Sequence, residues 1–315
     1  MTDPSKYKFN HSMIRVKDPK VSIEFYRYLG LSLLEHLRFP ESRFDLYLLA
    51  YDSPAAISPG RHRSSREGII ELTHNYGTEN QADYKISNGN ESPHKGFCHF
   101  GISVDDRQAA SKRIADAGYQ ISNLPLGSDA DGLTFVQDPD GYYIQLFQNA
   151  SSIGFDHSIG TDVGTYRLNY TMIRVKDPQA SLKFYKQVLG MIEMDTLTDE
   201  NAGFDLFFLG YSTPVSGQRL QGLDKIADRE GLLGLRWEHG TEREEGQVYH
   251  NGNVEPQGFG HTCIAVDDIE QACVRFEQLG VQWKKRLTDG KMSNIAFILG
   301  TIYEPFTYFH DVLDR

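Results

Sequence analysis

The chain has 315 residues, which is enough for two domains of ordinary size, each with its own hydrophobic core. Its net charge of -11 comes without a run of basic residues, so nucleic acid is not an expected partner. The three cysteines, Cys98, Cys263 and Cys273, form no CxxC pair, which argues against a disulfide framework and against a thiolate zinc site.

The sequence contains no apolar segment of membrane length. No stretch approaches the roughly 18 apolar residues that a membrane helix needs. The first residues, MTDPSKYKFN, lack the apolar core of a signal peptide. We therefore expect a soluble, cytoplasmic protein without a membrane partner.

The first half predicts strands alternating with helices. The segment SMIRV at 12–16 has the apolar pattern of a strand. A helix follows, because Asp18 is a good N-cap residue and Pro19 suits the first helical position. FDLYLLAY at 44–51 predicts a buried strand rich in Tyr, Phe and Leu. A second helix is expected over 105–118, where it starts at the pair Asp105 and Asp106 and stops at Gly118.

The second half repeats the first. MIRVKDP occurs at 13–19 and again at 172–178, and the matches continue in register to KGFCHFGISVDD and QGFGHTCIAVDD. We predict a first domain over 1–150, a Gly/Ser-rich linker over 151–164 and a second domain over 165–315. The predicted fold class is α+β, with two βαβββ modules in each half. Single modules are too small to close a core, so they are expected to pair into cupped sheets.

Several motifs resemble those of one enzyme family. MIRVKDP with FYRYLG, ELTHNYGTE, ISNGNESPHKGFCHFGISVDD and DPDGYYIQLF resemble glyoxalase I, also called lactoylglutathione lyase, of the vicinal-oxygen-chelate superfamily. The resemblance covers the whole chain and is to the tandem, single-chain form of the family. It implies a divalent metal, such as Zn, Ni, Co or Fe, held at sites to which both halves contribute two ligands each.

Carried over by motif, the resemblance implies a first metal site of His11, Glu71, His261 and one residue of the last strand. The corresponding second site would consist of Tyr170, Gly234, His99 and Gln145. Imidazoles and carboxylates suit a divalent metal, and the second set has one good ligand in four. The sequence therefore predicts one surviving site and a second position that is plugged or merely polar.

The fourth ligand of the first site has two candidates. An alignment without gaps of FVQDPDGYYIQLF with FILGTIYEPFTYF places Thr307 at the acid position, where it would be a poor ligand and no base. Shortening the DPDG turn by three residues places Glu304 there instead and completes a His/Glu/His/Glu set. The adjacent Pro305 is tolerable on an edge strand or at a strand start. We favour Glu304.

The resemblance also implies the chemistry. The family's substrate is the hemithioacetal of glutathione and an α-ketoaldehyde such as methylglyoxal, and the product is S-lactoylglutathione. A metal acts as a Lewis acid while a carboxylate moves a proton between neighbouring carbons. Glu304 would be the main base, and Glu71 would serve the opposite stereoisomer in addition to binding the metal.

Matched positions for glutathione are largely retained at the first site. Cationic and amide groups suit an anionic tripeptide, and the candidates are Arg15, Asn75, Lys285, Lys291 and Met292. At the second site Arg174 remains, but Glu238 stands in place of the asparagine. The losses of metal ligands and of substrate-binding groups thus fall on the same site.

Two other functions stay open at this stage. His11, Glu71 and His261 alone would form a two-His-one-carboxylate set, which suits a repurposed isomerase, cyclase or dioxygenase. A non-catalytic protein that binds a small molecule is the third possibility. Because the halves can pair within one chain, we expect a monomer.

Overall fold

The computed structural model describes residues 2–122, 134–149, 160–211, 223, 226–289 and 295–300, and the backbone of 306–311. Its elements form four βαβββ modules. The first consists of β1 (Lys8–Arg15), α1 (Pro19–Tyr28), β2 (Ser32–Phe39), β3 (Phe44–Ala50) and β4 (Ile69–Asn75). The second consists of β5 (Phe97–Val104), α2 (Arg107–Asp116), β6 (Ile121–Ser122), β7 (Thr134–Gln137) and β8 (Tyr143–Gln148).

The second half of the chain repeats this order. The third module consists of β9 (Arg167–Val175), α3 (Pro178–Lys183), β10 (Ile192–Asp199), β11 (Phe204–Gly210) and β12 (Leu232–Glu238). The fourth consists of β13 (Phe259–Val266), α4 (Ile269–Gln278), β14 (Trp283–Lys285), β15 (Ala296–Ile298) and β16 (Phe306–Asp311). The predicted βαβββ fold class is confirmed.

Aspartates start the four helices. The side chains of Asp18, Asp106, Asp177 and Asp268 each accept a hydrogen bond from a backbone N–H of the first turn. This contact satisfies a donor that the helix itself leaves unpaired. The predicted cap at Asp18 is therefore confirmed, and the second helix begins at the predicted pair of aspartates. In the described residues, no helix is both long and apolar enough to cross a membrane.

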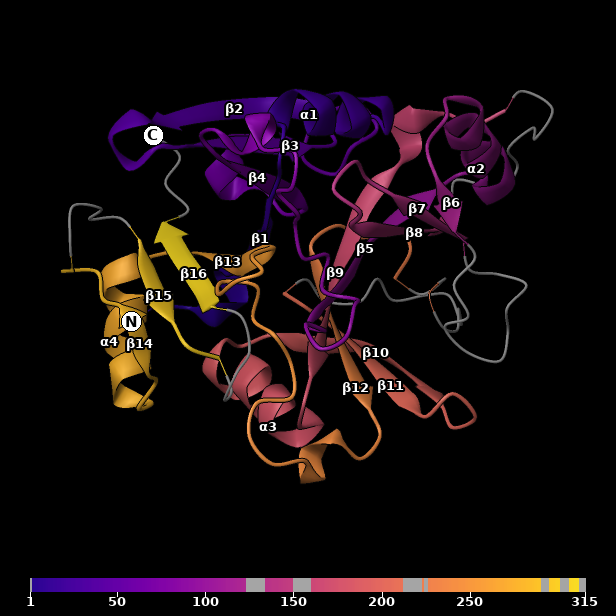
Figure 1. The fold of residues 1–315 in the computed structure, drawn as a ribbon. Coiled ribbons are helices and arrows are strands. Elements are labelled where there is room, and N and C mark those ends of the chain that lie inside the picture. The colour runs from indigo at the N-terminus through magenta and orange to yellow at the C-terminus, as the bar shows by residue number, and fades with distance from the viewer. Residues whose placement is uncertain are drawn as a thin grey trace.

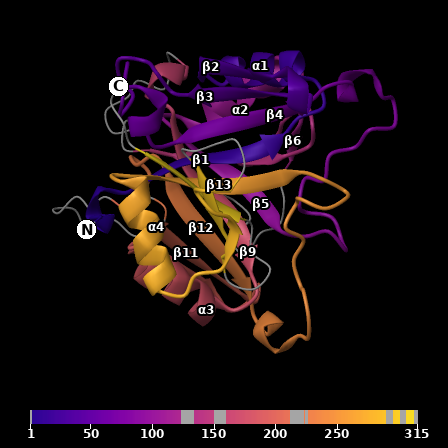
Figure 2. The ribbon, with the colours of Figure 1, turned by 90° about the vertical axis from the view of Figure 1, so that its left-hand side faces the viewer.

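The modules pair between the two halves of the chain. One sheet has the strand order β14-β15-β16-β13-β1-β4-β3-β2, so it joins the fourth module to the first. The other, β10-β11-β12-β9-β5-β8-β7-β6, joins the third to the second. The helices lie at the periphery (Figure 1), and β1 runs beside β13 (Figure 2). Each sheet thus contains strands from both halves, as the resemblance implies. The linker predicted over 151–164 lies largely outside the described residues, so the domain limits stay a prediction.

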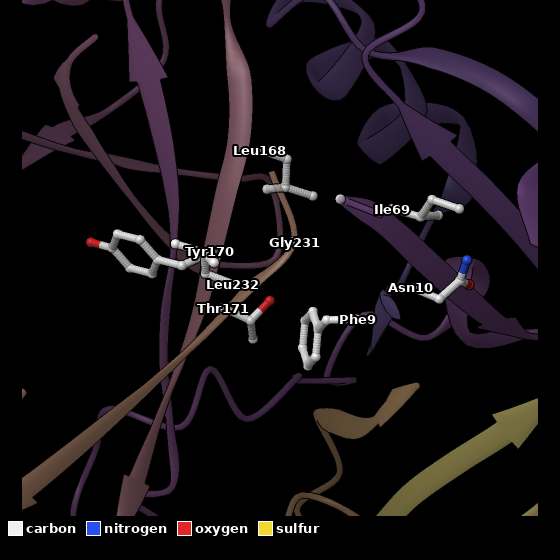
Figure 3. Close-up of a pocket in the computed structure, with 9 residues that line it drawn as sticks. Phe9, Asn10, Ile69, Leu168, Tyr170, Thr171, Gly231 and Leu232 are labelled. Carbon is white, nitrogen blue, oxygen red and sulfur yellow. The ribbon is translucent and has the colours of Figure 1, made fainter. Parts of the chain in front are cut away.

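The two sheets meet at a tightly packed seam. The Ser12 and Thr171 hydroxyls lie 2.8 Å apart across it. Figure 3 shows the narrow crevice beside this contact, with Phe9 and Ile69 on one side and Leu168 on the other. The turn that precedes β4 crosses the equivalent turn that precedes β12. A Cβ atom added to Gly231 would lie 2.8 Å from the Phe9 carbonyl oxygen and 2.6 Å from the Glu67 Cβ. The seam therefore requires glycine at 231.

Replacing Gly231 by alanine tests this packing. Gly231 has a φ of 67°, and alanine would suffer both the left-handed backbone and the clash with fixed backbone atoms. We expect Gly231→Ala to lower the free energy of unfolding by about 2–4 kcal/mol, measured by urea denaturation. Gly246→Ala is the matched control, because Gly246 has a φ of 71° and open space around it. Its loss should be about 1 kcal/mol. Equal losses in the two variants would contradict a packed seam.

Two carboxyl groups lie beside the same seam, of which Glu230 is buried and Glu67 is half-buried. Burial raises the pKa of Glu230 from 4.5 to about 8, against the opposing effect of Arg167 and Arg66. Burial likewise raises the pKa of Glu67 to about 7. The Glu230 Oε1 atom has no hydrogen-bond partner in the part of the chain that the structure describes. The folded protein therefore favours the protonated form of these groups.

This burial predicts a pH dependence of stability. Between about pH 5 and pH 8 the folded Glu230 carboxyl keeps a proton that the unfolded chain releases, so stability falls as pH rises, by at most about 1.4 kcal/mol per pH unit. Glu230→Gln should remove this contribution and stabilise the protein at pH 8 more than at pH 5. Urea unfolding at both pH values measures the difference. The exposed Glu41→Gln provides the control, and a parallel response of the two variants would argue against a buried, protonated Glu230.

Candidate metal centre

Three neighbouring strands carry the predicted ligands. His11 lies on β1, Glu71 on β4 and His261 on β13, and β1 is the central strand of the three. Met13 pairs with His261 on one side and with Glu71 on the other. Because side chains alternate along a strand, His11 shares a face with Met13 and hence with both partners. The register thus gathers ligands that are up to 250 residues apart in sequence.

The side chains converge on one point. The His11 Nε2 lies 3.2 Å from the His261 Nε2 and 3.5 Å from the Glu71 Oε2. The His261 Nε2 lies 4.0 Å from the Glu71 Oε1. Candidate ligand atoms of all three residues lie within 4.8 Å of one another, and all three residues are buried. The structure therefore brings together the three ligands that were predicted from the described parts of the chain.

The electrostatics of the cluster suit a cation. Burial, reinforced by the charge of Arg15, lowers the pKa of His261 to about 3, so this imidazole is neutral and has a lone pair to donate. Burial raises the pKa of Glu71 to about 7, with Arg63 acting in the opposite direction. A divalent metal would supply a neighbouring positive charge that stabilises the ionised form of Glu71. Two imidazoles and a carboxylate fit such a metal and leave coordination positions open.

The fourth position depends on strand register. In the second sheet, Gln145 on β8 pairs with Gly101 on β5. The equivalent of Gly101 on β13 is Cys263, and its partner on β16 is Tyr308, while Thr307 pairs with Thr262. Thr307 is thus one position away from the counterpart of Gln145, which the ungapped alignment assigned to it. The backbone register adds Tyr308 as a candidate, and Glu304 lies outside the described residues.

The predicted substrate groups are partly described. Arg15 is held by neutral acceptors, because its guanidinium donates to the carbonyl oxygens of Gly252 and Gly258 and to the Asn253 Oδ1. Asn75 ends β4. Lys285 on β14 donates to the Ile295 carbonyl oxygen at 3.0 Å. Lys291 and Met292 lie outside the described residues.

The equivalent position in the second sheet holds a closed hydrogen-bond triad. The Tyr170 hydroxyl donates to the Gln145 Oε1 at 2.5 Å, and the His99 Nε2 lies 3.1 Å from that oxygen and 3.2 Å from the hydroxyl. Burial and the charges of Arg174 and Arg236 lower the pKa of His99 to about 3. The triad joins the Tyr170 hydroxyl, the Gln145 Oε1 and the His99 Nε2 to one another, which agrees with the prediction of a plugged or merely polar site.

Small residues make room for this plug. A Cβ on Gly101 would lie 2.3 Å from the Tyr170 ring, so the ring occupies space that the side chain of Cys263 takes at the first site. A Cβ on Gly234, the counterpart of Glu71, would lie 2.6 Å from the Met172 methyl carbon. At the second site the ring of Tyr170 therefore takes the place of His11, and the Met172 side chain occupies the space beside Gly234, the counterpart of Glu71.

The anion-binding side of the second site is also filled. Arg174 donates to the carbonyl oxygens of Gly89 and Phe97 and to the Asn90 Oδ1, as Arg15 does to its own neighbours. In addition, its Nε lies 3.4 Å from a carboxylate oxygen of Glu238. A ligand carboxylate would have to compete with this internal one.

Comparison with known proteins identifies the family. The sequence profile of the Glyoxalase/Bleomycin resistance protein/Dioxygenase superfamily matches residues 8–146 and 167–309. The chain belongs to this superfamily. Lactoylglutathione lyase from Schizosaccharomyces pombe is 40% identical over 316 residues, covering 100% of this chain and 98% of its own. Glyoxalase I from Saccharomyces cerevisiae is 40% identical over 297 residues, covering 92% of this chain and 88% of its own.

The fold agrees with this membership. The crystal structure of glyoxalase I from Zea mays superimposes with a TM-score of 0.70 at 24% identity, covering 97% of this chain and 92% of its own. The resemblance predicted from the motifs is confirmed, and metal dependence is general in the glyoxalase I family.

The contrast between the two sites predicts one metal ion per chain. His261→Ala removes a ligand and should abolish stoichiometric binding of Zn²⁺, measured by elemental analysis after dialysis. His99→Ala makes the same change at the equivalent strand position, but it should leave the bound metal unchanged because the triad holds no second ligand that suits the ion. Two ions per chain, or loss of the ion in His99→Ala, would contradict this assignment.

Proposed function

We propose that the chain is a metal-dependent lactoylglutathione lyase with one working site, formed by His11, Glu71 and His261 together with a fourth ligand. It would isomerise the hemithioacetal of glutathione and methylglyoxal to S-lactoylglutathione. The observation that carries the proposal is the buried convergence of these three side chains from both halves of the chain. The full-length relatives named lactoylglutathione lyase and glyoxalase I support it.

The proposed roles follow from the chemistry of each group. When bound, a divalent metal supplies Lewis-acid stabilisation of the negative charge that develops on the substrate oxygens. His11 and His261 provide neutral nitrogen donors. A carboxylate must take a proton from the carbon that carries sulfur and return it to the neighbouring carbon. We assign this step to Glu304, and to Glu71 for the opposite stereoisomer.

Substrate binding is proposed to rely on Arg15. Among the described residues its hydrogen-bond partners are carbonyl and amide oxygens, and none of these partners is a carboxylate. A carboxylate of glutathione would supply a negatively charged partner. Asn75, Lys285, Lys291 and Met292 are proposed as the remaining contacts. The pairing of halves within the chain leads us to propose a monomer.

The decisive experiment is turnover of methylglyoxal and glutathione. Protein reconstituted separately with Zn, Ni, Co and Fe is assayed by the ultraviolet absorbance of the thioester product. We expect activity with at least one metal and a fall in kcat of about 100-fold or more in Glu304→Gln, because the proton-transfer group is lost. His99→Ala should retain the parent rate.

The outcomes separate the possibilities. Absence of turnover with every metal would overturn the lyase assignment and favour another reaction at a two-His-one-carboxylate centre. Full activity in Glu304→Gln would remove only its role as base. In that case Tyr308→Phe tests the residue that pairs with Cys263. A loss of metal affinity in this variant would assign the fourth ligand position to Tyr308.

A further inference from the structure

A buried asparagine lies directly beside the metal centre. Asn10 precedes His11 on β1, and it is 1% exposed. Its amide nitrogen donates to two backbone carbonyl oxygens, of Arg63 at 2.7 Å and of Arg66 at 2.8 Å. These carbonyl groups belong to the short turn that leads into β4. The amide group therefore connects two strands that carry metal ligands.

The two carbonyl groups determine which way the amide faces. Carbonyl oxygens only accept hydrogen bonds, so the nitrogen of the Asn10 amide must point at them and its oxygen must point away. That oxygen lies 2.7 Å from the His11 Nδ1. Because an amide oxygen also only accepts, the His11 Nδ1 must carry the hydrogen. The lone pair of the imidazole is then on Nε2, the atom that faces Glu71 and His261.

The second half contains the same pair of asparagine–carbonyl contacts, but a tyrosine follows the asparagine instead of a histidine. The Asn169 amide nitrogen donates to the carbonyl oxygens of Ile226 at 2.6 Å and of Arg229 at 2.7 Å. The next residue is Tyr170, whose hydroxyl donates to Gln145 instead. The Asn169 Oδ1 is buried and has no hydrogen-bond partner in the described part of the chain. The carbonyl contacts thus belong to the fold of both halves, and the contact with an imidazole belongs to the metal centre alone.

We propose that Asn10 is a positioning residue that fixes the tautomer and orientation of His11, so that Nε2 is the atom presented to the metal. The inference rests on the proposed role of His11 as a ligand. An imidazole without this acceptor can place its hydrogen on Nε2, and in that form it cannot bind the ion. Asn10 acts through His11 and touches neither metal nor substrate.

The first test is the tautomer in metal-free protein. With ¹⁵N-labelled histidine, long-range ¹⁵N–¹H correlation NMR separates the two tautomers, and His11→Gln assigns the His11 signals by their absence. We expect the Nδ1–H form in the wild-type protein and a loss of this preference in Asn10→Ala. Asn169→Ala loses the same pair of carbonyl contacts and should leave the His11 signals unchanged. An Nε2–H form of His11 in the wild-type protein would overturn the inference without any variant.

The second test is metal affinity. Competition for Zn²⁺ with a chromophoric chelator should show about 10- to 100-fold weaker binding in Asn10→Ala, the usual effect of losing a hydrogen-bond partner of a ligand. Asn169→Ala should stay within about threefold of the wild-type protein. Equal affinities in both variants would mean that Asn10 only supports the backbone. Failure of the wild-type protein to bind metal would overturn the proposed function instead, and the tautomer result would still stand.

Discussion

The pairing of β1 with β13 is the contact on which the proposed site depends. His11 and His261 come from opposite halves of the chain, and this antiparallel pairing brings their strands together. The parallel pairing of β1 with β4 then adds Glu71 at the same level. Without the exchange of modules between halves, each half would hold an incomplete set of ligands. Folding and assembly of the site therefore occur together, because the strand pairing that buries the faces of these sheets also brings the three side chains together.

The two sheets share this architecture but contain different chemistry. The pairing of β5 with β9 brings His99 beside Tyr170, as β13 brings His261 beside His11. The backbone arrangement is therefore preserved where the ligands are not. Met172 lies against Gly234, where the first site has Glu71, and Gly101 accommodates the tyrosine ring. Few side chains decide which copy has a metal centre, since the register comes from the strands.

The sequence predicted the modules of the fold, because these are visible as repeated motifs and periodic apolar patterns. Matching motifs located the modules, and the alternation of strands explains why His11 and Glu71 face the same way. The register of β16 was not predictable, because the sequence aligns with its repeat either with or without a gap and a short strand has no local signal that separates Thr307 from Tyr308. The role of Asn10 was also missed, although an asparagine precedes the ligand position in both halves. Its contact with His11 depends on which way the amide faces, and carbonyl groups more than fifty residues away determine that.

The two sites also differ in the free-energy cost of burying their polar side chains. At the second site His99, Gln145 and Tyr170 hydrogen-bond to one another, which lowers the cost of burying these polar groups. At the first site Glu71 is buried, and its raised pKa shows that burial penalises its negative charge more than Arg63 compensates for it. A bound cation would offset the cost of burying the negatively charged Glu71. The strong attraction to this poorly solvated carboxylate would in turn favour binding of the cation. The first copy therefore contains a buried carboxyl group that a bound cation would stabilise, whereas the second copy has Gly234 at the corresponding position.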